Sequence, residues 1–100
     1  MTPDPYKYFR PEACEIVDQF SRGVLDLENG GDSRATVQRL LRLAHTLKGA
    51  ARIVKQVEIA KRAHAIEDTL SPLRESGEPI RRDQIDAILQ HLDEINGQLF

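Results

Sequence analysis

The chain has 100 residues, of which 40% are hydrophobic and 30% are charged, and its formal net charge is −2. This length suits one small domain spanning residues 1–100, and a charge so close to zero argues against nucleic acid as a partner. The single cysteine excludes an internal disulfide, and without a signal-peptide pattern or an apolar run of roughly 20 residues we expect a cytoplasmic domain with no membrane partner.

The first predicted helix follows an apolar stripe that repeats in steps of three and four residues. Pro11 is expected in its first turn, where the missing N–H costs nothing, and Asn29-Gly30-Gly31 should end it. The preceding segment "YKYF" is expected to form a short extra turn against the bundle. The stripe consists of Phe9, Ala13, Ile16, Val17, Phe20, Val24 and Leu27.

The second predicted helix begins at Asp32 or Ser33, either of which can cap it. Its end carries no glycine or proline, but the apolar phase slips around residues 53–54, so we place a turn near Lys55-Gln56. The apolar stripe consists of Val37, Leu40, Leu41, Ala44, Leu47 and Ala51.

Two further amphipathic segments complete the chain, linked by "GEPIRRD" after a stop at Ser76-Gly77. No stretch alternates with period two, so we predict an all-α, antiparallel, up-and-down four-helix bundle. The third stripe consists of Ile59, Ala63, Ile66, Leu70 and Leu73, and the fourth of Ile85, Ile88, Leu89, Leu92, Ile95 and Leu99.

Positive charge is concentrated in the middle of the chain. Between Ser33 and Ala63 the only acidic residue is Glu58. This pattern fits either a solvated helix face or a site that handles anions. The basic residues of this stretch are Arg34, Arg39, Arg42, Lys48, Arg52, Lys55, Lys61 and Arg62.

Four polar side chains are expected to converge between the second and third helices. On a helical wheel His45 and Lys48 lie on one flank of their apolar stripe, together with Arg52. On the third helix Glu67 lies on the flank of its stripe, and His64 lies further out. Antiparallel packing then brings His45 level with Glu67 and Lys48 level with His64.

This group suits phosphoryl chemistry at an imidazole. A carboxylate that accepts a hydrogen bond from Nδ1–H of His45 would fix the tautomer and leave the Nε2 lone pair facing outward. Lys48, one turn away, offers a point charge for a phosphoryl group. Gly49 costs on the order of 1 kcal/mol relative to alanine in a helix, and it leaves the surface over the ring open to another protein.

Each of these residues also has a structural explanation. A lone helical histidine is usually a packing or surface residue, Lys48 alone is a solvated lysine, and Gly49 could serve close helix packing. Glu67 could pair with one of three neighbouring cations: Arg62, Lys61 or Arg74.

A metal site built from His45, His64 and Glu67 is disfavoured, because Lys48 would repel a cation. We assign Cys14 a role as helix filler. His91 is expected to be a solvated residue of the fourth helix.

The segment "AHTLKGAAR" followed by "AHAIEDTL" resembles the histidine phosphotransfer (HPt) domain, in the form found at the N-terminus of CheA-type chemotaxis kinases. The shared pattern is a histidine, two variable residues, Lys-Gly and a small residue, and then Ala-His-x-x-Glu-Asp on the next helix. "FRPEACEIVDQF" and "IDAILQHLDEI" resemble the first and fourth helices of such domains.

The resemblance implies a role for each position of the two motifs. One departure is Lys55, which stands where such domains usually have glycine and affects the loop, not the site. The implied roles are His45 as phosphoacceptor, Glu67 as holder of its Nδ1–H, Lys48 and His64 as tuning residues, and Gly49 and Ala50 as small neighbours.

The implied function is that of a phosphorelay carrier in a two-component system. A separate kinase domain would phosphorylate His45, and the receiver domain of a response regulator would take the phosphoryl group onto an aspartate. The domain is then no enzyme by itself and holds no cofactor, since ATP and magnesium come with the kinase. We expect a monomer that is the N-terminal module of a larger kinase chain. The alternative function is a helical adaptor that is never phosphorylated.

Overall fold

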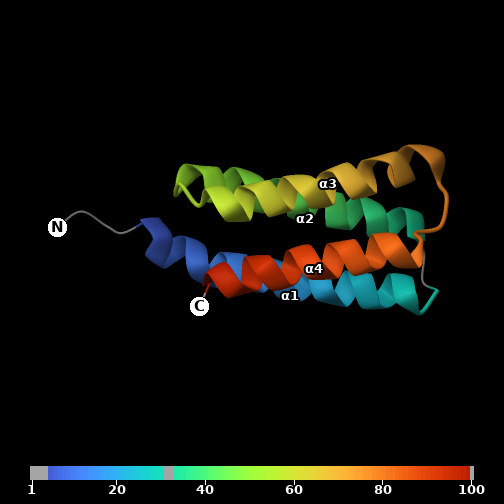
Figure 1. The fold of residues 1–100 in the computed structure, drawn as a ribbon, viewed down its shortest axis with the longest axis horizontal. Coiled ribbons are helices and arrows are strands. Elements are labelled where there is room, and N and C mark those ends of the chain that lie inside the picture. The colour runs from blue at the N-terminus through green and yellow to red at the C-terminus, as the bar shows by residue number, and fades with distance from the viewer. Residues whose placement is uncertain (1–4, 31–32, 100) are drawn as a thin grey trace.

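Four helices account for nearly all of residues 5–30 and 33–99, which the computed structural model describes. They are α1 (Pro5–Glu28), α2 (Ser33–Ile53), α3 (Val57–Ser76) and α4 (Arg82–Leu99). The helices run antiparallel, side by side, and the described ranges contain no strand (Figure 1). The predicted all-α up-and-down bundle is therefore confirmed, whereas the expected roles of Gly31 and Asp32 lie outside the described residues.

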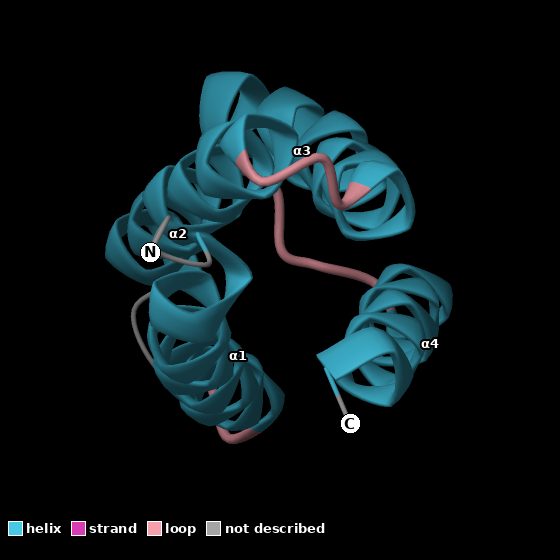
Figure 2. Cartoon of the chain, turned by 90° about the vertical axis from the view of Figure 1, so that its left-hand side faces the viewer, coloured by secondary structure: helices cyan, strands magenta, loops and turns pink. Residues whose placement is uncertain are grey.

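Each helix packs against its neighbours in the chain, and α4 closes the ring against α1 (Figure 2). The most extensive pairing joins α2 and α3. Gly23 brings α1 close to α2, because a β-carbon at this position would lie 2.5 Å from Cδ2 of Leu40. None of the described helices is long and apolar enough to cross a membrane.

The predicted apolar stripes form one continuous core. All their residues are buried except Val17 and Leu89, which are partly buried against the same core. Phe20 is the largest fully buried side chain. Burial of a leucine, isoleucine or phenylalanine side chain contributes about 1.5–3 kcal/mol, so aliphatic packing holds the bundle together.

The N-terminal segment differs from its prediction. The residues of "YKYF" form no separate turn but belong to α1, so Pro11 lies inside the helix and not in its first turn. Proline is tolerated there because it is exposed, and the carbonyl that it leaves without an N–H partner can face water. Tyr6 Oη and Arg10 Nε donate hydrogen bonds to the carbonyls of Gln98 and Leu99 and thereby tie this extension to the end of α4.

The turn between α2 and α3 lies where the phase slip placed it. The N–H of Lys55 donates to the carbonyl of Arg52 at 3.1 Å, and the N–H of Gln56 donates to that of Ala51 at 2.8 Å. This is the hydrogen-bond pattern of a Schellman motif, which needs a left-handed residue at its centre. Lys55 adopts that conformation with a φ of 62°, so the turn that usually has glycine forms with lysine instead.

Replacing Lys55 by glycine is therefore expected to stabilise the domain. A left-handed conformation costs a residue with a β-carbon about 1–2 kcal/mol, part of which glycine loses again through the greater freedom of the unfolded chain. We expect Lys55→Gly to raise the free energy of unfolding by about 0.5–1 kcal/mol, measured by urea denaturation. Lys55→Ala is the control, since it removes the charge but keeps the strain; an equal gain in both variants would contradict the explanation.

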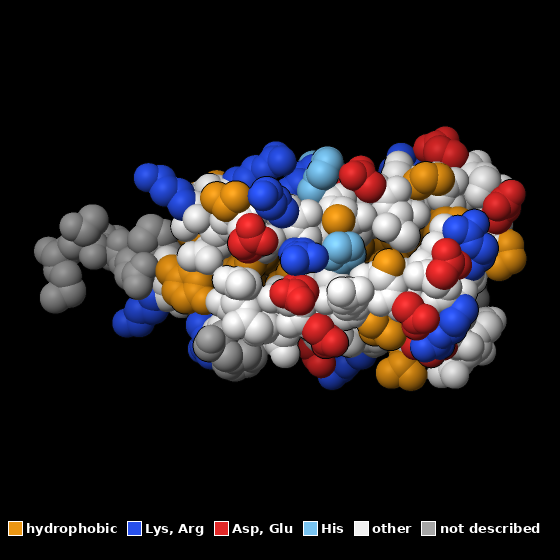
Figure 3. Space-filling model, in the orientation of Figure 1, with side chains coloured by type: hydrophobic (Ala, Val, Ile, Leu, Met, Phe, Trp, Pro, Cys, Tyr) orange, Lys and Arg blue, Asp and Glu red, His pale blue; other side chains and the backbone are white. Residues whose placement is uncertain are grey.

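The basic stretch of the sequence lies on α2 and on the first half of α3. Figure 3 shows Lys and Arg side chains gathered along the upper left of the molecule, over the end of the bundle that holds the α2–α3 turn. This charge lies close to the groove in which the predicted site residues meet.

Candidate functional site

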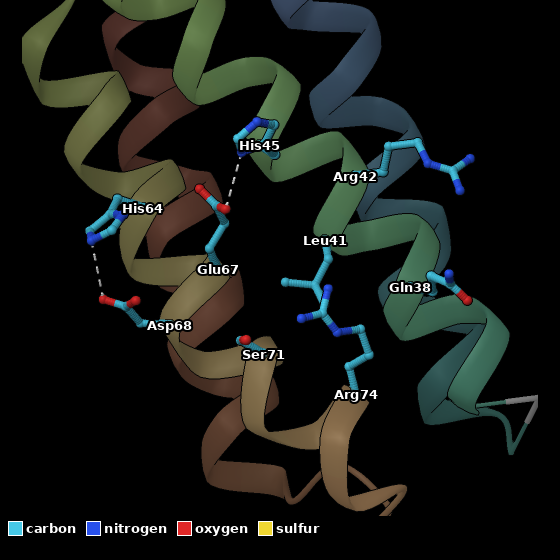
Figure 4. Close-up of a pocket in the computed structure, with 9 residues that line it drawn as sticks. All are labelled: Gln38, Leu41, Arg42, His45, His64, Glu67, Asp68, Ser71 and Arg74. Carbon is cyan, nitrogen blue, oxygen red and sulfur yellow. Dashed lines mark ion pairs between the residues drawn. The ribbon is translucent and has the colours of Figure 1, made fainter.

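A groove of about 400 Å³ runs between α2 and α3 (Figure 4). Four side chains of α2 and five of α3 line it, and the predicted phosphoacceptor is one of them. The lining residues are Gln38, Leu41, Arg42 and His45 from α2, and His64, Glu67, Asp68, Ser71 and Arg74 from α3.

The imidazole of His45 faces the carboxylate of Glu67 across this groove. Nδ1 lies 3.4 Å from Oε2, as the alignment of the two helices predicted. The histidine side chain is 74% exposed, whereas the glutamate is only 19% exposed. With Nδ1 facing the carboxylate, Nε2 is the ring nitrogen left to act on another molecule.

Lys48 contacts the other oxygen of the same carboxylate. Its Nζ lies 2.7 Å from Oε1 of Glu67, and the lysine side chain is 13% exposed. Oε1 is shielded from solvent and accepts no well-aligned hydrogen bond from the described residues, so the ammonium charge is what compensates its burial. The structure thus places Lys48 behind the glutamate, where it anchors the group that faces His45.

The surroundings of Glu67 keep it ionised. Burial alone would raise its pKa, but contact with the Lys48 ammonium, and then with His45, outweighs burial and lowers the pKa below its ordinary value. A carboxyl group whose pKa is lowered by folding stabilises the fold at any pH above the pKa that it has in the unfolded chain. This stability is lost as the pH falls through the pKa that the group has in the folded chain. At neutral pH the carboxylate is therefore available to accept a hydrogen bond from the imidazole.

The second histidine lines the groove without joining this cluster. Nε2 of His64 lies 3.5 Å from Oδ2 of Asp68, one turn along α3, and both side chains are more than half exposed. His64 therefore lines the same groove as His45 and Glu67 but pairs with its own carboxylate, whereas Lys48 contacts Glu67 without lining the groove.

The three supporting residues lie on different sides of α2. A β-carbon added at Gly49 would meet no atom of the described residues within 4 Å, which agrees with an open surface at this position. Ala50 instead packs against the core and lines a hollow with Phe9 and Val54 on the side of α1. Arg52 is exposed and lines a second pocket, which it shares with His64.

Among the described residues Glu67 pairs with none of the three cations that the sequence offered as alternative partners. Each of these cations lies near another carboxylate. Lys61 lies 3.9 Å from Glu58, Arg62 lies 4.0 Å from Glu94, and Arg74 lies 3.2 Å from Glu75. In the described part of the chain, no group of three or more His, Cys, Asp and Glu side chains is arranged to hold a metal ion.

The prediction that His91 is solvated is wrong. The residue is half-buried, and its Nδ1 lies 3.4 Å from Nη1 of Arg62 on α3. Burial and then the arginine charge lower its pKa, against a smaller opposing effect of Glu94. His91 therefore belongs to the α3–α4 contact and lies outside the groove.

The sequence model of the Hpt domain matches residues 6–98 of the chain. The chain belongs to the Hpt domain family.

Relatives of this Hpt domain include the chemotaxis proteins CheA of Borreliella burgdorferi and Treponema pallidum. They are 31% and 34% identical over 91% and 93% of this chain, but the matches cover only 10% and 12% of those proteins. The chain thus spans about a tenth of the length of these relatives. Among solved structures, the CheA phosphotransferase domain from Thermotoga maritima superposes with a TM-score of 0.87 at 28% identity, over 94% of this chain and 90% of that one.

Several groove residues of the Hpt domain escaped the sequence analysis. Gln38 and Arg42 precede His45 by seven and three residues, and Ser71 and Arg74 follow Glu67 by four and seven. These are the spacings that keep side chains on one helical face, so extending the wheel from the two central residues would have found all four. In Figure 4 the side chain of Arg74 reaches along the groove toward Leu41.

Proposed function

We propose that His45 is the phosphoacceptor of this domain and that the domain carries the phosphoryl group from a kinase to a response regulator. The observation that supports this most is the pairing of an exposed imidazole with a half-buried, ionised carboxylate. Nδ1 is held at 3.4 Å from Glu67, and the ring itself is 74% exposed. A packing histidine would be buried, and an inert surface histidine would need no anchored partner.

In the proposed reaction the Nε2 lone pair of His45 attacks the γ-phosphorus of ATP held by the kinase. The N–P bond forms as the bond to the ADP oxygen breaks, and ADP leaves with the electron pair. The ring becomes positively charged during attack, and the Glu67 carboxylate stabilises this charge through Nδ1–H. In the second transfer an aspartate oxygen of the receiver attacks the phosphorus, and the imidazole recovers its lone pair.

The relatives support a proposal for the partners. One relative that is 28% identical over 85% of this chain is the sensor histidine kinase CheAY of Helicobacter pylori. We infer that this domain likewise receives its phosphoryl group from a histidine kinase domain, in the cytoplasm where ATP is available. ATP and magnesium enter with that kinase, because the sequence has no glycine-rich phosphate loop: the lysine that such a loop requires does not follow Gly30 at the right spacing.

Incubation of the purified domain with Mg-ATP alone is expected to leave it unlabelled. Addition of the kinase core of a CheA relative, such as that of Treponema pallidum, should then add one phosphate per chain. Intact-mass spectrometry after several hours reads both reactions directly. A gain of one phosphate without kinase would contradict the carrier function, because it would require a catalytic centre in this chain.

A further inference from the structure

A second pocket of about 370 Å³ lies beside the groove, at the α2–α3 turn. Its lining residues are Arg52, Lys55, Val57, Ala60, Lys61 and His64, and we call it the turn pocket. His64 lines both the turn pocket and the phosphoacceptor groove, so the two are neighbours. A protein that fills the turn pocket is thereby placed next to His45.

The floor of the turn pocket is apolar and open to solvent. Val57, the first residue of α3, is 62% exposed, and Ala60 lies one turn further along the helix. Ala60 is only 7% exposed, so Val57 is the apolar side chain that the turn pocket presents to solvent. An exposed apolar surface rimmed by polar side chains is typical of surfaces that bind another protein.

The rim of the turn pocket is positive. It carries Arg52, Lys55 and Lys61, and of these only Lys61 has a carboxylate nearby, Glu58 at 3.9 Å. Among the described residues no acidic side chain pairs with Arg52 or Lys55. Figure 3 shows Lys and Arg side chains gathered over the end of the bundle that holds the α2–α3 turn.

We infer that the turn pocket docks the receiver domain of the response regulator, with an apolar side chain on Val57 and acidic groups against the rim. The inference rests on the proposed carrier function and adds a docking surface outside the phosphoacceptor groove. An aspartate that accepts a phosphoryl group with the help of Mg²⁺ needs further carboxylates nearby to hold the ion, so its surroundings are acidic. Acidic surroundings complement the three cations of the rim and speed the encounter.

A kinase active site has the opposite requirement. It must hold the triphosphate of ATP, and it does so with cationic groups and metal ions. The cationic rim of the turn pocket would therefore attract the acidic surface around an acceptor aspartate. It would repel the cationic surface that surrounds a bound nucleotide. The charge of the turn pocket thus favours the second transfer over the first.

The test separates the two transfers with charge reversals at the rim. The kinase core first phosphorylates the domain. The phosphorylated domain is then mixed with a single-domain response regulator from the source organism, chosen as the one that accepts the phosphoryl group fastest from wild type. We expect Lys55→Glu and Lys61→Glu to lower kcat/KM of the transfer to the receiver by about tenfold and to weaken its salt dependence. Val57→Asp should lower it as well, and an acidic residue in the first turn of α3 does not oppose folding.

Arg22→Glu is the matched control, because this exposed residue of α1 pairs only with its neighbour Asp18 among the described residues. Its transfer to the receiver should equal that of wild type. Unchanged transfer in the Lys55 and Lys61 variants, or an equal loss in Arg22→Glu, would overturn the docking surface. So would slower loading by the kinase with normal transfer, which would assign the pocket to the kinase. Failure of wild type to be loaded would refute the carrier function itself.

Discussion

Replacing His45 by glutamine is expected to abolish phosphorylation by the kinase while the helical circular-dichroism spectrum stays unchanged. The side chain is 74% exposed and adds nothing to the core, so its loss removes the acceptor nitrogen without a cost in packing. Radiolabelling with [γ-³²P]ATP and the kinase core measures the first effect. The label on wild type should be labile in acid and stable in alkali, as for a phosphoramidate.

The other two histidines provide the controls for this experiment. His64→Gln and His91→Gln should both still be labelled, since His64 pairs with Asp68 and His91 packs against Arg62. Full labelling of the His45 variant, or an acid-stable label on wild type, would contradict the assignment of the phosphoacceptor.

Replacing Glu67 by glutamine is expected to slow phosphorylation by about 10- to 100-fold, by analogy with the cost of removing the carboxylate that orients a metal-bound histidine. An amide keeps the shape of the side chain but cannot stabilise positive charge on the ring. The loading rate measures this effect, and nitrogen-15 NMR of His45 reports the tautomer populations. Unchanged rates and tautomers in Glu67→Gln would reduce the glutamate to a structural ion-pair residue.

The contact between Lys48 and Glu67 makes glutamine a better replacement for Glu67 than alanine. The Lys48 ammonium lies 2.7 Å from Glu67 Oε1 in a site where the lysine is only 13% exposed. Truncation in Glu67→Ala would leave that charge without a partner and cost about 1–3 kcal/mol, whereas the glutamine oxygen keeps a polar atom beside it. Lys48→Met is the matched control, because it keeps the aliphatic stem but removes the charge that pairs with the carboxylate. Its thermal midpoint gives the cost in stability, and its loading rate gives the effect on the orientation of His45.

The fold was predictable because each helix carries its own apolar period. The stripes identified the buried residues except Thr36 and Ala60, and the phase slip near residues 53–54 placed the turn near Lys55-Gln56. The pairing of His45 with Glu67 followed from the same turn. Pro11 was the exception: it lies within α1 and not in its first turn, at an exposed position where water can satisfy the carbonyl that loses its partner.

The electrostatic details of the site could not be obtained in this way. A helical wheel gives the direction in which a side chain leaves the helix, but not the rotamer that a long side chain adopts. The lysine at position 48 could have faced solvent, and the structure instead turns it back to Glu67. Likewise, half-burial of His91 depends on how closely α3 and α4 approach, which no single helix determines.

At Gly49 the residue that would be best for stability differs from the residue that is best for the proposed function. Because a β-carbon there would meet no described atom within 4 Å, the bundle itself has room for any small side chain. Alanine would even be favoured in the helix by about 1 kcal/mol. Selection for stability alone would therefore remove this glycine, and an engineer who optimises the melting temperature would choose it early. We propose that glycine is required only in the complex, where a partner must approach the imidazole, and that the free domain is less stable than it could be for this reason.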